Sequence, residues 1–422
     1  MNVEEIMCKE SIIKTRIDDA KERRVELHAH TKMSRYDSVV SAKDLIMTAA
    51  RWGWEAIAIT DHGVTQAFPE AVKTVVENNL NLKVIYGMEG YMTGEDYKQG
   101  RANHVSILAK NIEGIYNLNE LVRLSFRHMF RQNRIPKNKI DKYREGLLIG
   151  SACIAGELFQ AIIKGYSDEK LIKIANFYDY LEVQPWGYYR HYMLYDNYWI
   201  QSFKTEEDAQ KVIYKIIELG ERLNKLVVAT SDVHFLDEDD ADIRAVLKHA
   251  IGFHDADKQP PCFLRTTKEM LDEYSFLGNK TAYDIVVKNP RLIADMVEKI
   301  VPMPTGDDTK LMLNLNDADK MDSWDDGVFR MSVIKKIAKV TAESYIRRYI
   351  DERKVNFSDE KIKDILDGIT GVKTHTDVHG DMIINVPYRI YKLLPTQILP
   401  STNICISHYD SNAFLNFRDE KT

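Results

Sequence analysis

Two histidines, His28 and His30, end the segment Val25–His30 near the start of the chain. The residues of this segment alternate between apolar and polar, a pattern that predicts a half-buried strand. Side chains two positions apart on a strand point to the same face, so both imidazoles would project together. Such a pair can chelate one metal ion, but short motifs of this kind also occur by chance on solvated loops. Further ligands at other strand ends would favour the metal site.

More residues of the same chemical kind follow at such positions. Histidine, aspartate, glutamate and cysteine are the side chains that bind zinc, manganese or iron. Nearly all of these residues come just after an apolar run, although His104 begins its run. Nine ligands are too many for one ion and suit two or three metals that share a bridging carboxylate, as in phosphoryl chemistry. The candidates are His28, His30, Asp37, His62, Glu89, His104, Cys153, Asp232 and His234.

Each candidate taken alone also has an ordinary structural explanation. Asp37 and Asp61 could cap helices, His62 could be a satisfied loop residue, and Cys153 could be a small buried hydrophobe. It is the recurrence of such residues along the chain that favours a metal site.

Short apolar runs that predict strands alternate with helical segments. Strands are expected at residues 25–30, 55–60, 82–86, 105–109, 146–150, 180–183 and 226–230, and helices at 41–52, 68–78, 118–130 and 206–223. This alternation predicts a parallel sheet. Seven such units favour a barrel of the (β/α) type, whose active residues gather at the carboxyl ends of the strands. An open doubly wound sheet is the alternative, but candidates from many strand ends favour the barrel.

Composition indicates a packed globular chain. The 422 residues are 44% hydrophobic and 29% charged, and the net charge of -6 gives no global sign of nucleic-acid binding, although a local basic patch remains compatible with it. No apolar run is long enough to span a membrane, and Met1–Arg24 is charged throughout. The four scattered cysteines are expected to be thiols or ligands. We therefore expect a cytoplasmic protein.

The motifs resemble the PHP (polymerase and histidinol phosphatase) domain family. The resemblance is closest to the PHP domain of PolC-type bacterial DNA polymerase III alpha subunits, in a stand-alone or truncated form. It extends over about Arg24–Gly306. It is carried by His28-x-His30, Thr60-Asp61-His62, Gly87-x-Glu89, His104, Cys153 and Asp232-x-His234, with support from Lys32–Asp37, Gln66–Ala71, Gly150–Leu158 and Tyr180–Pro185.

This resemblance implies a distorted, TIM-like (β/α)7 barrel that holds three divalent metal ions. The implied ligand sets are His28, His30, Glu89 and Asp232 for one ion, then Glu89, His104 and Cys153, and then Asp37, His62 and His234. All nine positions have an acceptable side chain, which is the main reason to expect activity. Asp61, Glu89 and Asp232 are expected to be catalytic. Asp61 would orient a ligand imidazole from behind, or else cap the following helix.

One departure from the family concerns the insertion that PolC-type enzymes usually carry after the Gly-x-Glu strand. That insertion is a proofreading exonuclease. Here only Gly90–Asn103 separates Glu89 from His104, which leaves no room for it.

Four parts are expected along the chain. These are a lead-in segment over residues 1–24, helical over Met1–Lys21; a PHP barrel with a trailing helical extension over 25–306; an acidic linker over 307–326; and a C-terminal region over 327–422, helical and then partly a palm-like remnant. Val328–Lys354 predicts a helix with one basic side, which is either a solvated face or a nucleic-acid-facing one. Residues 368–373, 380–387 and 394–397 weakly resemble a polymerase palm, α+β in character.

The expected function is metal-dependent hydrolysis of a phosphodiester such as a DNA 3′ end, in the manner of a 3′–5′ exonuclease. DNA and replication proteins are the expected partners, and no association with a membrane is expected. The alternatives are a catalytically silent remnant that binds DNA or the replisome, and a small-molecule phosphatase of the histidinol-phosphatase type. Metal analysis separates the first from the second, and substrate size separates the first from the third.

No polymerase activity is expected from this chain. A polymerase palm needs a strand-borne acidic pair for two magnesium ions. The closest acidic pairs are Asp255 with Asp257, in a polar loop, and Asp317 with Asp319, in the predicted linker. A primer-extension assay with the purified chain should give no template-dependent product, whereas a replicative polymerase in the same buffer should. Incorporation by the chain itself would contradict this expectation.

Overall fold

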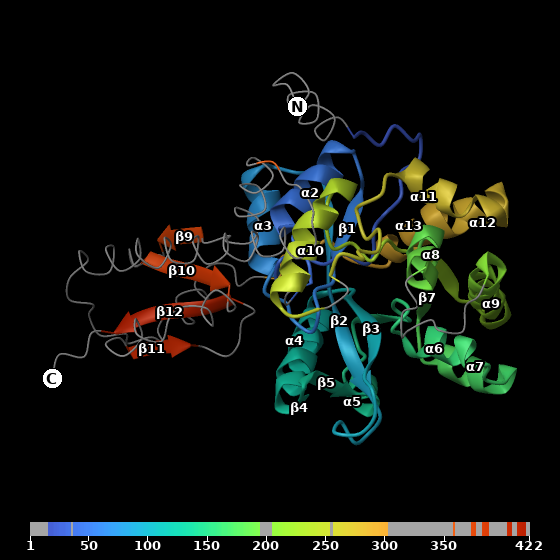
Figure 1. Cartoon of the computed structure of the whole chain (residues 1–422), viewed down its shortest axis with the longest axis horizontal. Coiled ribbons are helices and arrows are strands. Elements are labelled where there is room, and N and C mark those ends of the chain that lie inside the picture. The colour runs from blue at the N-terminus through green and yellow to red at the C-terminus, as the bar shows by residue number, and fades with distance from the viewer. Residues whose placement is uncertain are drawn as a thin grey trace. The chain divides into compact units, whose positions relative to one another are not determined.

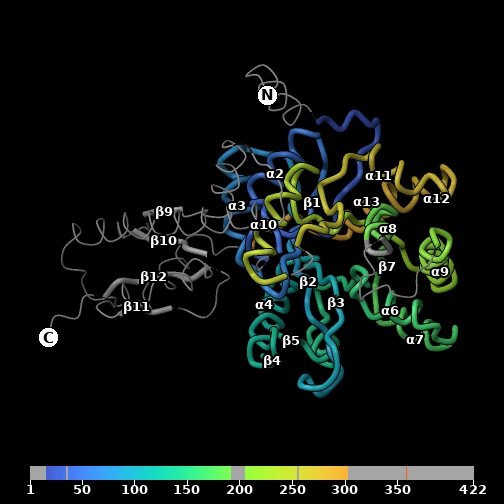
Figure 2. Tube along the Cα trace, viewed as in Figure 1, coloured from blue at the N-terminus to red at the C-terminus, as the bar shows by residue number. Residues whose placement is uncertain are grey.

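The computed structural model describes residues 16–34, 37–194, 205–253 and 256–302, together with Ser358 and four short strands between residues 373 and 418. The chain divides into two compact units (Figures 1 and 2). The first comprises residues 1–34, 40–241 and 259–302, and the second comprises residues 35–39, 242–258 and 303–422. Among the described residues, none of the helices combines the length and apolarity needed to span a membrane.

The first unit is built on an eight-stranded sheet. Its strands are β1 (Ala56–Ile59), β2 (Lys83–Thr93), β3 (Asn103–Ala109), β4 (Met129–Phe130), β5 (Gln132–Pro136), β6 (Leu147–Gly150), β7 (Tyr180–Val183) and β8 (Leu226–Ala229). They follow the order β4-β5-β2-β3-β6-β7-β8, and β1 pairs with the start of β2. Isolated parallel bridges join Glu26 to Ile57 and Ala29 to Val233. The unit is therefore a mixed α/β fold with a curled, half-barrel sheet (Figure 1).

Among the strands that were predicted, the expectation of a parallel sheet is wrong for β3. β3 pairs antiparallel with both β2 and β6, whereas β1 with β2, β6 with β7 and β7 with β8 are parallel. The connection between β2 and β3 is a short hairpin, and a hairpin reverses the chain without a crossover helix. The amino end of β3 therefore lies beside the carboxyl ends of the parallel strands. This reversal explains why His104 begins its apolar run instead of ending it.

Two further expectations about strands need correction. The segment Val25–His30 is fully buried and not half-buried, because its polar side chains also face the interior. The strand predicted at residues 82–86 extends as β2 to Thr93, so Glu89 lies within the strand and not after it. The β4–β5 hairpin was not predicted, and it takes Met129 and Phe130 from the expected helix 118–130.

Helices surround the sheet of the first unit. They are α2 (Ala42–Arg51), α3 (Phe68–Glu77), α4 (Ile112–Arg127), α5 (Lys137–Lys142), α6 (Glu157–Ile163), α7 (Asp168–Asn176), α8 (Trp186–Leu194), α9 (Glu206–Leu223), α11 (Thr267–Glu273), α12 (Asn279–Tyr283) and α13 (Asn289–Asp295). α9 has the predicted bounds and begins with a capping box of Thr205 and Asp208. Ser41 is the N-cap of α2 and accepts a hydrogen bond from the amide of Asp44. The described part of the expected lead-in helix, residues 16–21, has no regular structure.

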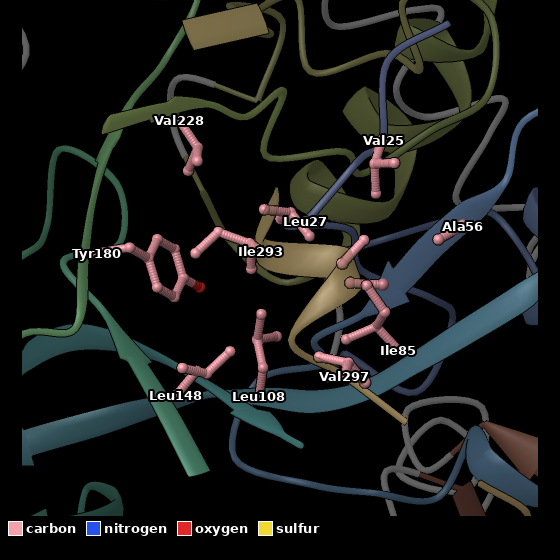
Figure 3. Close-up of a cluster of buried hydrophobic side chains, with 12 residues drawn as sticks. Val25, Leu27, Ala56, Ile85, Leu108, Leu148, Tyr180, Val228, Ile293 and Val297 are labelled. Atoms are coloured by element: carbon pink, nitrogen blue, oxygen red, sulfur yellow. The ribbon is translucent and has the colours of Figure 1, made fainter. Parts of the chain in front are cut away.

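A layer of apolar side chains fills the interior of the curled sheet (Figure 3). It contains Val25, Leu27, Ala56, Ala58, Ile85, Leu108, Leu148, Tyr180 and Val228 from the strands, with Ile293, Ala294 and Val297 from α13 and the turn after it. On the parallel strands, these residues precede the candidate ligands in sequence. On the antiparallel β3, Leu108 follows His104 instead. The apolar layer therefore lies toward the amino ends of the parallel strands, and the polar ligands lie toward their carboxyl ends.

The second unit contains a four-stranded antiparallel sheet. Its strands are β9 (Lys373–Thr376), β10 (Met382–Pro387), β11 (Asn403–Ile406) and β12 (Asn412–Arg418), in the order β11-β12-β10-β9. The stretch 380–387, predicted as part of a palm-like remnant, overlaps β10. The predicted linker over 307–326 and the predicted basic helix over 328–354 lie outside the described residues. α10 (Ala241–Ala250) lies almost wholly in this unit.

Closure of the apolar layer by α13 predicts a clear difference between two neighbouring residues. Ile293 is 1% exposed within the layer, whereas Leu292 is 39% exposed on the other side of the helix. Ile293→Ala should lower the free energy of unfolding by about 2–4 kcal/mol, because it removes buried methyl groups and leaves a cavity. Leu292→Ala should cost less than about 1 kcal/mol. Urea unfolding followed by tryptophan fluorescence measures both, and equal losses would contradict the assignment of α13 to the core.

Candidate metal centre

Eight of the nine predicted ligands lie together at one end of the sheet of the first unit. Seven of them are buried, and the side chain of His104 is 18% exposed. They come from the segment 25–30, from β2 and β3, and from the turns after β1, β6 and β8. The eight residues are His28, His30, His62, Glu89, His104, Cys153, Asp232 and His234.

A buried carboxylate shapes the segment that carries the first two histidines. Oε1 of Glu26 accepts hydrogen bonds from the backbone amides of Leu27 and His28, at 3.1 and 2.9 Å. These amides therefore bond to a side chain and not to a neighbouring strand. Leu27 contributes to the apolar layer, while His28 and His30 enter the ligand cluster. The strict alternation predicted for this strand is thus interrupted at Glu26.

Glu89 is at the centre of the ligand contacts. Its Oε1 lies 2.9 Å from Nδ1 of His104 and 3.3 Å from Nε2 of His28. Sγ of Cys153 is 3.5 Å from the same oxygen. Its Oε2 lies 2.9 Å from Nδ1 of His62. The two carboxylate oxygens therefore face different groups of ligands, as expected of a bridging carboxylate.

Asp232 is the second carboxylate of the cluster. Its Oδ1 lies 3.2 Å from Nε2 of His30 and 3.5 Å from Nε2 of His28. Its Oδ2 accepts a hydrogen bond of 2.7 Å from the hydroxyl of Tyr188. The residue has a φ of 50°, a left-handed conformation that is strained for a non-glycine residue and is often found at functional sites. Its carbonyl oxygen lies 2.7 Å from Nδ1 of His234, which must donate, so Nε2 of His234 remains available as a ligand.

Opposite charges inside the cluster outweigh the cost of burial. Burial alone lowers the pKa of His28, but the carboxylates of Glu89, Glu182 and Asp232 raise it well above its usual value. Burial alone raises the pKa of Glu89, but His104 and His28 help to hold it well below its usual value. Glu89 is therefore ionised and ready to accept cations.

Two other groups are kept neutral instead. Burial, and then the charges of His62 and His234, lower the pKa of His30 well below its usual value. A neutral imidazole is the form that binds a metal. Burial and the charge of Glu89 raise the pKa of the Cys153 thiol well above its usual value. Without a cation, this sulfur stays protonated, so metal binding would release its proton.

The residues present fit divalent metal ions. Three groups have ligand atoms that all lie within 4.8 Å of one another: His30, His62 and His234; His28, His30 and Asp232; and His62, Glu89 and His104. Oε2 of Glu89 and Oδ1 of Asp232 are buried, and although imidazole nitrogens lie 2.9 and 3.2 Å from them, neither oxygen accepts a hydrogen bond within the described structure. A buried carboxylate oxygen without a donor is costly, and a cation would satisfy it. Nitrogen, oxygen and sulfur ligands of this kind suit zinc, manganese or iron.

Comparison with known families agrees with this geometry. A model of the PHP domain family matches residues 26–185, a range that includes the ligands from His28 to Cys153. Residues 26–185 form a PHP domain. The family assignment made from the sequence motifs is thereby confirmed.

The curated relatives of this PHP domain are much longer proteins. The chain is 43% identical to a DNA polymerase III PolC-type from Clostridium perfringens over 220 residues, which are 51% of this chain and 15% of that protein. It is 29% identical to a DNA polymerase III PolC-type from Caldanaerobacter subterraneus over 493 positions, covering 69% of this chain and 35% of that protein. The second alignment is longer than the whole chain, so that relative has additional residues within the matched stretch.

Similarity to solved structures is weaker. A protein from Bifidobacterium adolescentis, provisionally described as a metal-dependent phosphoesterase, matches with 14% identity and a TM-score of 0.32. The match covers 50% of this chain and 87% of that one. A score of this size is too low to support an inference about function.

Glu182, a carboxylate that was not among the predicted site residues, contacts the ligand His28 on the side of its ring away from the cluster. Oε2 of Glu182 lies 2.9 Å from Nδ1 of His28 and also accepts a hydrogen bond from Thr230. Its Oε1 accepts from the amide of Ala152. Such a carboxylate holds the imidazole in the tautomer that leaves Nε2 for a metal. The available signal was an acidic residue in the middle of a buried strand, β7.

Asp61 acts on the cluster through a serine. Its Oδ1 accepts hydrogen bonds of 2.6 Å from the hydroxyl of Ser34 and from the amide of Thr31. Oγ of Ser34 lies 3.0 Å from Nδ1 of His30 and accepts from the amide of His62. Asp61 therefore orients an imidazole indirectly, which agrees with the first of the two roles considered for it. It does not cap α3, whose N-cap is Ala67.

Asp37 is the predicted ligand that the structure assigns to different contacts. It belongs to the second unit, where its carboxylate forms ion pairs with Arg244 and Lys248. It is in none of the three candidate metal groups of the described residues. A role for Asp37 as a metal ligand therefore stays a prediction.

The Glu182–His28 contact predicts a loss of metal affinity. Glu182→Gln should raise the dissociation constant for Mn²⁺ about tenfold to a hundredfold, because the amide fixes the imidazole less firmly. Glu77→Gln is a suitable control, since Glu77 is 60% exposed on α3 and pairs with Lys73. Isothermal titration with Mn²⁺ measures both variants. Unchanged affinity in Glu182→Gln would show that the contact does not position the ligand.

Proposed function

We propose that this PHP domain is a metal-dependent phosphoesterase that hydrolyses phosphodiesters. One observation carries the proposal: six ligand side chains gather around the carboxylates of Glu89 and Asp232, and each carboxylate has a buried oxygen that makes no hydrogen bond in the described structure. An arrangement with that many ligands accommodates more than one ion, and paired ions are the usual device for displacement at phosphorus. The ions would polarise the phosphate and activate water when bound.

We propose two to three ions per chain. His28, His30, Glu89 and Asp232 would hold the first ion, Glu89, His104 and Cys153 the second, and His62, His234 and Asp37 the third. The contacts of Glu89 on both of its oxygens support its role as a bridge. The least supported ligand is Asp37, for the reason given above. Zinc, manganese and iron all fit the donor set.

The residues around the ligands would hold them in position during the reaction. Glu182 and the Ser34–Asp61 pair fix the orientations of two imidazoles. Tyr188 fixes Asp232 by donating a hydrogen bond to its Oδ2, which leaves Oδ1 for a cation. Ligands held in this way need little rearrangement when charge develops on the phosphate. The partly exposed His104 indicates the side from which a substrate would approach.

We further propose that the substrate is DNA, hydrolysed from its 3′ end. Similarity to PolC-type polymerases supports this choice, and we propose the cytoplasm as the location and replication proteins as partners. The chain would not itself polymerise. The parts would be the lead-in over residues 1–24, the barrel over 25–306, the linker over 307–326 and the remainder over 327–422.

A closed barrel would explain why the ligands converge. The bridges from Glu26 to Ile57 and from Ala29 to Val233 support a ring in which the segment 25–30 joins β1 to the end of β8. With β2, β3, β6 and β7, this ring would be the distorted (β/α)7 arrangement of the family. Each member of the ring would then bring its ligands to one opening.

The test is nucleotide release with and without an intact bridge. The purified chain with Mn²⁺ should shorten a 5′-labelled single-stranded DNA from its 3′ end, and elemental analysis should find two to three ions per chain. Glu89→Gln should lower the rate at least about a hundredfold, because an amide is a poor bridge between cations. Circular dichroism checks that the variant is folded.

Other outcomes would favour the alternatives. Fewer than one ion per chain after reconstitution, or bound metal without hydrolysis of any phosphate ester, would indicate a silent binding module. Hydrolysis of histidinol phosphate but not of DNA would indicate a small-molecule phosphatase. Near wild-type turnover by Glu89→Gln would show that the site is wrongly assigned.

A further inference from the structure

A local concentration of positive charge stands out against the net charge of -6. Between Arg123 and Arg144 there are eight lysine or arginine residues and one acidic residue, Asp141. This stretch covers the end of α4, the β4–β5 hairpin and α5. These elements are neighbours in Figure 1, where they lie beside the end of β2. Such clustering is the electrostatic footprint of a surface that binds a polyanion.

Five of these eight cations form no salt bridge with a carboxylate among the described residues. Salt bridges pair Arg123 with Glu120, Lys137 with Glu157, and Arg144 with Asp141 and Asp179, and Arg134 donates to two backbone carbonyls. Among the described residues, the other four form no salt bridge. We name these four cations, with Phe130, the basic hairpin surface: Arg127, Arg131, Lys139 and Lys142.

Arg131 occupies a position where its side chain is not favoured by the backbone. It is the single residue between β4 and β5, and its φ is 65°. Glycine adopts this conformation without strain and asparagine with little, whereas arginine does so at a cost. An exposed cation at the tip of the hairpin is thus held there despite its local preference. A function of the charge would account for it.

An aromatic ring lies among the cations. The guanidinium carbon of Arg134 is 5.0 Å from the ring centroid of Phe130, and that of Arg131 is 5.7 Å from it. Phe130 is only partly buried. An accessible ring beside cations matches the way in which proteins bind single strands, since bases stack on the ring while phosphates meet the charges.

Backbone pairing connects the hairpin that carries the basic hairpin surface to segments that carry metal ligands. β5 pairs with β2 at Arg134 and Tyr91, two residues after Glu89. Nδ2 of Asn133, on β5, donates a hydrogen bond of 2.9 Å to the carbonyl of Gly63, the residue after His62. Gly63 has a φ of 65°, and a Cβ on it would lie 2.3 Å from that same Nδ2. The hairpin is therefore held against the turn that carries a ligand.

We propose that the basic hairpin surface binds single-stranded DNA and leads it to the metal centre. The proposal rests on the function proposed above, which makes a DNA end the substrate. The isolated ring favours a single strand over a duplex, whose bases are already stacked. Similarity to DNA polymerases favours DNA over RNA.

Binding of a labelled oligonucleotide to the full chain tests the proposal. The probe is a fluorescein-labelled oligothymidylate of about 20 nucleotides, long enough for one binding site, with phosphorothioate linkages at its 3′ end to prevent turnover. The variant is Arg127→Gln with Arg131→Gly, followed by anisotropy at several salt concentrations. The dissociation constant should rise at least about fivefold, and the salt slope should fall by about 0.7 for each charge removed.

The matched control removes the same net charge elsewhere. Lys73→Gln with Lys268→Gln changes two lysines that are 71% and 75% exposed on α3 and α11. This control should bind within about twofold of the unaltered chain. The Arg131→Gly change should not lower the melting temperature, because glycine relieves the positive φ. Weaker binding by an equally stable protein therefore reports on the charge and not on folding.

A second variant separates stacking from charge. Phe130→Leu keeps an apolar side chain but removes the ring, so it should weaken binding several-fold with little change in the salt slope. Equal affinity of the Arg127/Arg131 double variant and the unaltered chain would overturn the proposal. Tighter binding of an RNA or duplex probe would overturn the choice of occupant.

The outcomes also distinguish this proposal from the proposed function. If DNA binding depends on the hairpin but the protein hydrolyses no phosphodiester, the proposed binding surface is supported and the proposed enzymatic function is refuted. Metal-dependent hydrolysis of DNA, by a protein whose DNA binding is unchanged by substitutions in the hairpin, would support the proposed enzyme and refute the binding surface.

Discussion

The burial of Glu89 among imidazoles is the interaction on which the rest of the site depends. Its side chain is 1% exposed, and an isolated carboxylate at that depth would be neutral. Its charge is retained because histidines from three separate segments surround it. The fold must therefore bring those segments together for the carboxylate to be tolerated, and the carboxylate in turn gives the histidines their partner. Removing one side of such a buried arrangement is expected to cost much more than the pairs contribute together.

The apolar layer and the polar cluster are two consecutive levels of the same sheet. The segment 25–30 and the strands β1, β2, β6 and β8 supply apolar side chains to the first level and ligands, within or just after them, to the second, so packing of the first level fixes the position of the second. α13 and the turn after it close the apolar level with Ile293, Ala294 and Val297. In the segment 25–30, the amides of Leu27 and His28 donate to the side chain of Glu26. This local irregularity allows Leu27 to join the apolar level and His28, the next residue, to join the ligand level. The stability of the folded domain and the geometry of its ligands therefore depend on the same small set of strand residues.

Much of this arrangement could be predicted from sequence, because short apolar runs and the residues after them are local signals. All seven expected strand positions correspond to strands or to the bridged segment 26–29, and eight predicted ligands converge. The direction of β3 was not predictable in this way, since periodicity does not report orientation. Glu182 was missed because it lies inside an apolar strand and touches the site only through His28. The contacts of Asp37 depend on α10, a partner distant in sequence.

The antiparallel β2–β3 ladder also determines where this domain tolerates change in length. Glu89 pairs with Ser106 and Tyr91 with His104, and the ladder continues to Met92 and Asn103 before the chain turns. The spacing of the two ligands is thus set by cross-strand register and not by the length of the connection. Residues added between Met92 and Asn103 would lengthen the turn while leaving both ligands in place. The tip of this hairpin is therefore a natural point at which a whole extra domain can enter or leave such a chain during evolution without dismantling the metal centre.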